Sequence, residues 1–112
     1  MALTNDLEHL LSLLAKRKLS VAILSVLHDG PSRYSTLHHT VSQISPFTVH
    51  ARTLTDTLNH LCAEGLVNHH QDDDSADYRL TAGGEELVDL LAEIKRWSQQ
   101  HRASGKAQPP ER

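Results

Sequence analysis

The sequence has little of several residue types that common protein functions require. It contains one cysteine, Cys62, which excludes an internal disulfide and a zinc site built from several thiolates. Aromatic residues make up 4% of the chain, too few for the broad stacking surfaces that hold single-stranded nucleic acid. No stretch approaches the roughly 20 apolar residues of a membrane span. The composition therefore disfavours a disulfide scaffold, a membrane protein and a single-strand binder.

A surplus of positive charge is also missing. The formal net charge is -3 and the sequence pI is about 6.3, whereas a protein that contacts phosphates usually has a basic surface. Residues 31–65 are neutral overall, and residues 66–81 are acidic because Arg79 stands against four aspartates. Several of the nine histidines lie in this part of the chain and change charge near neutral pH. Its effective charge can therefore be more positive than the formal count.

The length of the chain and the order of its charges limit the remaining classes. With 112 residues we expect a single domain over residues 1–102, too small for an enzyme cleft between two lobes, and a disordered tail over residues 103–112. Acids precede the first apolar run and bases follow it, the reverse of a signal peptide, which predicts a cytoplasmic protein. The chain lacks a glycine-rich phosphate loop and a nucleophile motif, so we expect no enzyme activity and no cofactor.

Two apolar segments predict the first two helices. Leucines three and four residues apart form one stripe of a helix over residues 3–18, with Thr4 or Asn5 as its cap. Residues 19–28 are apolar nearly all round, which indicates a central core helix that ends at the following Asp-Gly-Pro. The basic triplet of residues 16–18 is interpreted as a solvated helix end, with phosphate contact as the less favoured alternative.

Residues 32–65 have the layout of a helix-turn-helix. A short helix capped by Ser32 has two inward-facing residues, Leu37 and Val41. After a break that contains proline, a second helix over residues 48–63 begins with Thr48 as its cap. Its buried stripe recurs at three- and four-residue steps and consists of Ala51, Leu54, Leu58 and Leu61.

The exposed face of this second helix carries short side chains that form hydrogen bonds. It has no lysine; Arg52 suits guanine and Asn59 suits adenine in a DNA major groove. An ordinary polar surface is the alternative interpretation. The face consists of His50, Arg52, Thr53, Asp56, Thr57 and His60, with Thr55 and Asn59 on its flank.

A hairpin and a long helix complete the predicted domain. The hairpin over residues 66–81 forms a wing whose turn, residues 72–74, is three aspartates; these repel phosphate and predict a wing held off the DNA backbone. Thr81 caps a helix over residues 82–102 whose apolar residues cover more than one face. That excess, together with the leucine stripe of residues 3–18, predicts a second burial surface for a partner subunit.

Several short segments in a fixed order carry a family resemblance. They are residues 19–30 (the family's W-x-x-x-I-L-x-x-L-x-x-G region), 33–37 (R-F-x-E-L), 52–61 (x-L-T-x-x-L-x-x-L), 64–67 (D/E-G-L-V), 78–84 (Y-x-L-T-x-x-G) and Trp97. In this order and spacing the chain resembles the HxlR-type winged helix-turn-helix transcriptional regulators, within the wider MarR and PadR group. The resemblance covers about residues 15–100.

The resemblance implies a mainly α winged helix-turn-helix fold with a small β-hairpin, dimerising through its N- and C-terminal helices. It implies a bacterial, nucleoid-associated homodimer that binds double-stranded DNA at a near-palindromic operator, as a repressor or an activator, with repressor preferred. We expect the DNA-binding residues to be Arg33, Tyr34, Ser35, Thr48, His50, Arg52, Thr53, Thr55, Asp56, Asn59 and Arg79. We expect the dimer interface to contain Leu3, Leu7, Leu10, Leu11, Leu14, Leu87, Leu91, Ile94 and Trp97.

The sequence departs from the family pattern in three places. It lacks the N-terminal cysteine through which some members respond to electrophiles, and Cys62 is interpreted as a packing residue. The loop over residues 42–50 is longer than the usual tight turn, and the wing tip is acidic, which leaves Arg79 as the contact candidate of the wing.

Three alternatives stay open at this stage. The same fold can be a protein-interaction module that dimerises without binding DNA, which the acidic pI favours. The histidines, with residues 72–74, can form a metal-responsive sensor if they meet in space. A small hydrophobic effector can bind between the dimer helices and the DNA-binding core.

Overall fold

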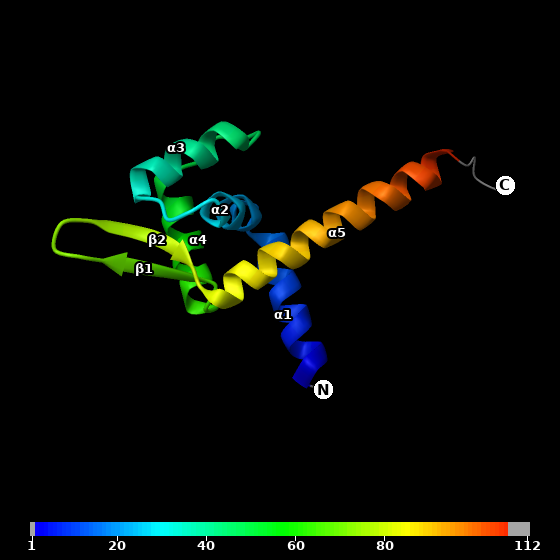
Figure 1. Ribbon diagram of the computed structural model, residues 1–112, viewed down its shortest axis with the longest axis horizontal. Helices are drawn as coiled ribbons and strands as arrows, with labels where there is room; N and C mark the ends of the chain where they lie inside the picture. Colours follow the sequence, from blue (N-terminus) through cyan, green and yellow to red (C-terminus); the bar gives the residue numbers. More distant parts are fainter. Residues whose placement is uncertain (1, 108–112) are drawn as a thin grey trace.

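The computed structural model describes the backbone of residues 2–107 and the side chains of residues 7–102. In chain order its elements are α1 (Ala2–Lys16), α2 (Leu19–His28), α3 (Tyr34–Ile44), α4 (Ala51–Ala63), β1 (Val67–Gln71), β2 (Ala76–Leu80) and α5 (Ala82–Ala107) (Figure 1). Five helices and a two-stranded antiparallel hairpin in this order confirm the predicted winged helix-turn-helix within the described residues.

Helix α2 is the centre of the domain. It packs against α1, α3, α4, β2 and α5, and Ile23, Leu24 and Leu27 are almost completely buried. Its apolar residues on nearly every side explain this position, because a helix surrounded by other elements has no solvent face to cover with polar groups. The predicted central core helix is confirmed, although Val21 is exposed on the side toward α5.

Helices α3 and α4 bury the stripes that helical spacing predicts, with two corrections. Leu37, Leu54 and Leu58 have no exposed surface. Ala51 was expected inside but is exposed, because it opens the helix where the chain still lies at the surface. Thr57 was expected outside but is 1% exposed. Its hydroxyl donates to the Thr53 carbonyl at 2.8 Å, which satisfies the polar group and makes its burial tolerable.

Three predicted helix caps are wrong. Helix α4 starts at Ala51 with His50 in the cap position and no side-chain cap bond, so Thr48 lies outside it. Ser32 exchanges two backbone hydrogen bonds with Tyr78, at 3.0 and 2.8 Å, and so adds a short third edge to the hairpin instead of capping α3. Helix α1 already begins at Ala2, so Thr4 and Asn5 lie within it.

The junction of α4, the hairpin and α5 is tightly closed. The Thr81 hydroxyl donates to the Gly65 carbonyl at 2.6 Å and accepts the Gly84 amide at 3.0 Å, which confirms Thr81 as the cap of α5. A Cβ at Gly84 would lie 2.2 Å from the Leu66 carbonyl oxygen, so no larger residue fits. Gly65 has a φ of +79° and ends α4 in the left-handed conformation that glycine adopts without strain.

Helix α5 projects far from the rest of the domain (Figure 1). It runs over 26 residues to Ala107, so the first part of the tail expected from residue 103 is helical, and residues 108–112 lie outside the described residues. In the described part of the chain, we find no helix whose length and apolar character would let it span a membrane.

Candidate nucleic-acid interface

The outer face of α4 is the candidate DNA-contacting surface. At 100° per residue, Arg52, Asp56 and Asn59 lie opposite the buried stripe of Leu54 and Leu58, and all three are exposed. We call these three residues the recognition face. The helix has 13 residues, a length of about 20 Å, which suits insertion into a major groove.

One flank of α4 is held by α3. The Tyr34 hydroxyl donates to the Ala51 carbonyl at 3.1 Å and lies 3.2 Å from the Thr55 hydroxyl. Tyr34 and Thr55 are both predicted to contact DNA; in the structure their hydroxyl groups also contact each other, and Thr55 remains exposed. Arg33 and Ser35, at the start of α3, remain exposed beside them. This flank therefore presents the Arg33 cation and the hydroxyl groups of Ser35 and Thr55 next to the recognition face.

The long turn between α3 and α4 is anchored and does not form a free loop. The His38 ring nitrogen Nε2 lies 3.0 Å from the Val49 carbonyl oxygen, and the Val49 side chain is buried in the core. Thr48 and His50 on either side of Val49 are exposed. The turn is longer than the family pattern, but these contacts hold the start of α4 against α3.

The other flank of α4 meets the junction of α1 and α2. The Arg17 guanidinium donates to Nε2 of His60 at 2.6 Å, so the basic triplet of residues 16–18 lies beside the helix. Thr53 belongs to the same flank and is exposed. Lys16 and Lys18 are exposed, as a solvated helix end requires, and Arg17 is half-buried. The run of cations just before the core helix is the signal in the sequence for this position beside α4.

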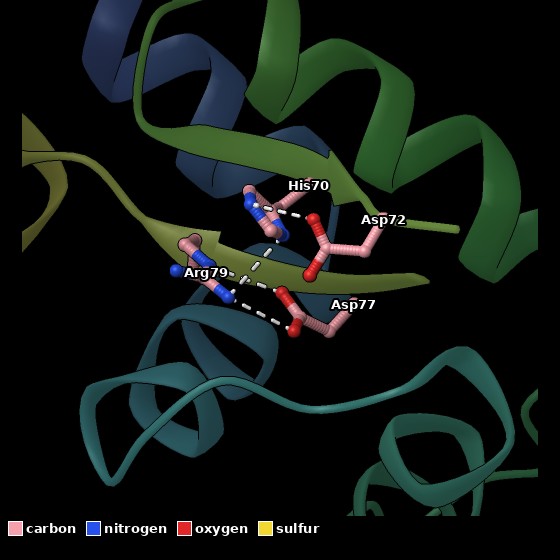
Figure 2. Close-up of polar contacts among 4 residues, drawn as sticks. All are labelled: His70, Asp72, Asp77 and Arg79. Carbon is pink, nitrogen blue, oxygen red and sulfur yellow. Dashed lines mark hydrogen bonds and ion pairs between the residues drawn. The ribbon is translucent and has the colours of Figure 1, made fainter. Parts of the chain in front are cut away.

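In the wing, the positive charge of Arg79 is paired with the carboxylate of Asp77 (Figure 2). The Arg79 guanidinium donates from Nε and Nη2 to the two carboxylate oxygens of Asp77, each at 3.0 Å. This bonding holds the pKa of Asp77 below its usual value and raises the pKa of Arg79. His70 lies between Arg79 and Asp72, with ring nitrogens 3.5 Å and 3.6 Å from them. The expected DNA contact from Arg79 therefore competes with an existing partner.

The tip of the wing is the most acidic part of this surface. Asp72, Asp73 and Asp74 are all exposed in the turn between β1 and β2. Near the base of the hairpin, His69 stacks on Tyr78 with ring centroids 4.3 Å apart. The described residues contain no group of three or more histidine, cysteine, aspartate or glutamate side chains that could hold a metal ion.

Cys62 lies in the last turn of α4 and is half-buried against the core. Burial raises the pKa of its thiol, which keeps it protonated at neutral pH. The thiolate is the reactive form, so this environment suits a packing residue better than a thiol sensor.

The residues expected in a dimer interface fall into two groups. Leu10, Leu14 and Leu87 pack partly against the core, and Leu91 is half-buried. The exposed group contains Leu7 and Leu11 on α1 at 53%, and Ile94 and Trp97 on α5 at 59%. The side chain of Leu3 lies outside the described side chains. Leu13, which the stripe omits, is buried, and Leu90 adds to the exposed group.

A groove between α2 and α5 continues this exposed apolar surface. It has a volume of about 500 Å³ and is lined in part by Val21, Val88, Leu91 and Ile94. Apolar side chains therefore lie exposed on α1, α2 and α5, and the recognition face lies on a different helix, α4.

Solved structures of transcriptional regulators share this architecture. The reduced form of the transcriptional regulator YodB from B. subtilis is 28% identical, covers 85% of this chain and 90% of its own, and has a TM-score of 0.73. The transcriptional repressor BigR from Xylella fastidiosa is 26% identical, with coverages of 81% and 84% and a TM-score of 0.66. A possible HxlR family transcriptional factor from Thermoplasma volcanium GSS1 is 23% identical, with coverages of 83% and 81% and a TM-score of 0.66, and supports the fold alone.

The comparison with protein families gives the broadest match. No protein of curated function matches the sequence significantly. The model of the HxlR-like helix-turn-helix family matches residues 14–106, which include the core helix, both helices of the helix-turn-helix, the wing and nearly all of α5. The chain therefore belongs to the HxlR-like helix-turn-helix family and is a winged helix-turn-helix DNA-binding transcriptional regulator.

Proposed function

We propose that this regulator is a repressor that binds a near-palindromic operator on the nucleoid as a homodimer. The observation that carries the proposal is the pairing of two separate exposed surfaces on one small domain. The recognition face of α4 is polar and free for DNA, while α1 and α5 present large apolar side chains away from it. A repressor is preferred over an activator because BigR, a structural neighbour 26% identical, is a transcriptional repressor.

The recognition face has the donors and acceptors that base edges require. Arg52 suits the two acceptors of guanine, Asn59 suits the donor and acceptor of adenine, and Asp56 accepts from the amino group of cytosine. The exposed hydroxyls of Thr48, Thr53 and Ser35, together with His50 and Arg33, surround this face and suit phosphate oxygens. Thr55 lies at the edge of the recognition face, and its hydroxyl, which also contacts the Tyr34 hydroxyl, is available to DNA.

The apolar surface supports a second copy of the same chain as the partner. Trp97 and Ile94 are both 59% exposed, and a tryptophan in such a setting is a typical anchor of an interface. Two copies related by a two-fold axis present two α4 helices to one face of the DNA. Such a dimer contacts two half-sites about one helical turn apart, roughly 34 Å, which makes the operator near-palindromic.

Selection of bound duplexes from a random DNA pool tests this function directly. We expect enrichment of a sequence with inverted half-sites whose centres are about 10 base pairs apart, or a multiple of this. A single unpaired site, or no enriched sequence, would contradict the homodimeric repressor. As a companion variant, Ile94→Asp should give a monomer by light scattering and lose most operator affinity, with its helical circular dichroism retained. A variant that stays dimeric would remove α5 from the interface.

A protein-interaction module is the second candidate, and the acidic wing favours it. Residues 72–74 expose three carboxylates beside the helix-turn-helix, a charge that opposes DNA and suits a basic protein surface. Binding to promoter-length duplex at two salt concentrations separates the two functions. A DNA-binding regulator loses affinity steeply as salt rises. Absence of binding even at low salt would favour the interaction module.

A further inference from the structure

We propose that a groove beside α4 holds a backbone phosphate of the bound DNA, with Lys16 and Lys18 as its ligands. The groove has a volume of about 220 Å³ and lies where the α1–α2 junction approaches the helix-turn-helix. This phosphate site rests on the proposed DNA-binding function and extends it to residues outside the helix-turn-helix and the wing. Its lining consists of Lys16, Arg17, Lys18, Leu19, Phe47, Thr53 and Thr57.

The positive charges of the groove are not neutralised by neighbouring carboxylates in the described residues, so they are available to a phosphate. Within the described residues, Lys16, Arg17 and Lys18 form no ion pair with a carboxylate, whereas Arg79 is bound by Asp77 and Arg96 by Glu93. The three cations are consecutive in the chain, so their charges add at one place. Lys18 occupies the N-cap position of α2, a helix of 10 residues whose N-terminal end carries a partial positive charge, and Lys16 is the last residue of α1.

Neighbouring contacts hold these cations beside α4. Arg17 donates to Nε2 of His60, on the flank of α4, at 2.6 Å. The Lys18 ammonium lies 5.8 Å from the centroid of the Phe47 ring, in the turn that leads into α4. Phe47 is 40% exposed and lines the groove. Arg17 and Lys18 are therefore attached to the same elements that position the recognition face, and Lys16 lines the same groove.

The location of the groove fits the shape of a duplex. A helix in the major groove lies between two phosphate backbones, so each of its flanks faces a row of phosphates. On one flank of α4 the structure has Arg33 and Ser35 at the start of α3. On the opposite flank it has Thr53, His60 and the basic triplet. The triplet supplies the cation that this second flank otherwise lacks, because α4 carries Arg52 as its one arginine and has no lysine.

The test is the salt dependence of DNA binding by Lys16→Gln/Lys18→Gln, measured by fluorescence anisotropy on a duplex selected by the wild-type protein. The site holds one phosphate in each subunit, and each lost phosphate contact should lower the slope of log affinity against log salt by about 0.9. A homodimer that loses this contact in both subunits should therefore show a slope lower by nearly 2. At low salt the affinity should fall on the order of tenfold or more. The ranking of mutated half-sites should not change, since phosphate contacts carry no sequence information.

Two further variants make the result specific. Arg96→Gln/Arg102→Gln removes the same charge from exposed positions on α5, and its salt slope should equal that of the wild type. Lys16→Arg/Lys18→Arg keeps the charge and should retain most of the slope. Melting temperature and light scattering confirm that each variant is folded and has the wild-type assembly. An equal fall in the α5 variant, or a loss of slope in the arginine variant, would overturn the phosphate site.

The outcome also separates this inference from the proposed function. If the wild type binds selected DNA and Lys16→Gln/Lys18→Gln has an unchanged slope, the phosphate site is wrong and the DNA-binding function stands. If the wild type binds no duplex at low salt, the proposed function fails and the phosphate site fails with it.

Discussion

Helix α4 and the wing both lie on the candidate DNA side of the domain, and their charges are arranged in opposite ways. On α4, Arg52 is exposed on the recognition face beside Asp56, and no carboxylate in the described residues forms an ion pair with it. On the wing, Arg79 donates to Asp77 from two of its three guanidinium nitrogens, Nε and Nη2, and the tip carries three aspartates. An arginine in a predicted contact region is therefore available to DNA only if no neighbouring carboxylate already pairs with it.

Among the substitutions in α4 and the wing, Arg52→Ala should change the affinity for the operator most. Loss of one arginine–guanine contact costs about 1–3 kcal/mol, and a homodimer loses it in both half-sites. Specific operator binding should therefore fall by roughly a hundredfold or more, measured by anisotropy. Arg102→Ala, which removes the same charge from α5, should have little effect. A variant that loses its fold or dimer would instead assign Arg52 a structural role.

Neutralisation of the wing tip should have the next largest effect, in the opposite direction. In Asp72→Asn/Asp73→Asn/Asp74→Asn three carboxylates that repel phosphate disappear, so affinity for non-specific duplex at low salt should rise by roughly threefold to tenfold. The change should vanish at high salt because exposed charges are screened. Unchanged affinity at low salt would indicate that the wing tip lies too far from the backbone to act on it.

Release of Arg79 should have a smaller effect than the wing-tip change. In Asp77→Asn the guanidinium loses its carboxylate partner and becomes free to contact phosphate, so affinity should rise about twofold to fivefold at low salt. Arg79→Gln in the wild-type background should change affinity little, and in the Asp77→Asn background it should abolish the gain. A large loss from Arg79→Gln alone would show that Arg79 already contacts DNA.

The pH dependence of this pair follows from the pKa of Asp77. The pKa of Asp77 in the folded protein lies below its usual value. The ion pair with Arg79 therefore stabilises the wing fully at any pH above the pKa of an aspartate in the unfolded chain. The support is lost only as the pH falls through the lower folded value. The Asp77→Asn gain should therefore be the same at about pH 6 and about pH 8. A gain that changes between these two values would assign the effect to a histidine of the wing.

Thiol oxidation should have the smallest effect. The raised pKa of Cys62 keeps the thiol protonated, so diamide or a quinone should react slowly and leave operator affinity within about twofold of the untreated value. Mass spectrometry of the treated protein checks the modification, and Cys62→Ser serves as the control. A rapid loss of binding that Cys62→Ser prevents would contradict the assignment of Cys62 as a packing residue.

Most of the fold could be predicted because it depends on periodic burial along single segments. The spacing of Leu54, Leu58 and Leu61 identifies the buried face of α4, and the exposed face is the opposite side of the helix. A prediction based on neighbouring residues was wrong where a contact with a distant segment decides the structure. Ser32 has the chemistry of a cap, but its backbone pairs with Tyr78, and nothing local to residue 32 indicates a partner 46 residues away.

The candidate site was predictable in part for the same reason. The recognition face belongs to one helix, so helical geometry is sufficient to identify it. The bonds that decide which side chains are free join separate elements, as Tyr34 joins α3 to α4 and Arg17 joins the α1–α2 junction to His60. Asp77 and Arg79 are two residues apart on one strand face, and this spacing could have indicated their pairing.

The close approach of Gly84 to the Leu66 carbonyl has a mechanical consequence. With the Thr81 hydroxyl bonded on both sides, the end of α4, the wing and the first turn of α5 meet at a junction where no side chain fits at residue 84. In the proposed homodimer, α5 then acts as a stiff lever between the subunit contact and the recognition helix. A rotation of one α5 against its partner swings both α4 helices and alters their separation. A signal that reaches the dimer helices can thus change the half-site spacing that the dimer fits, without contacting a DNA-binding residue.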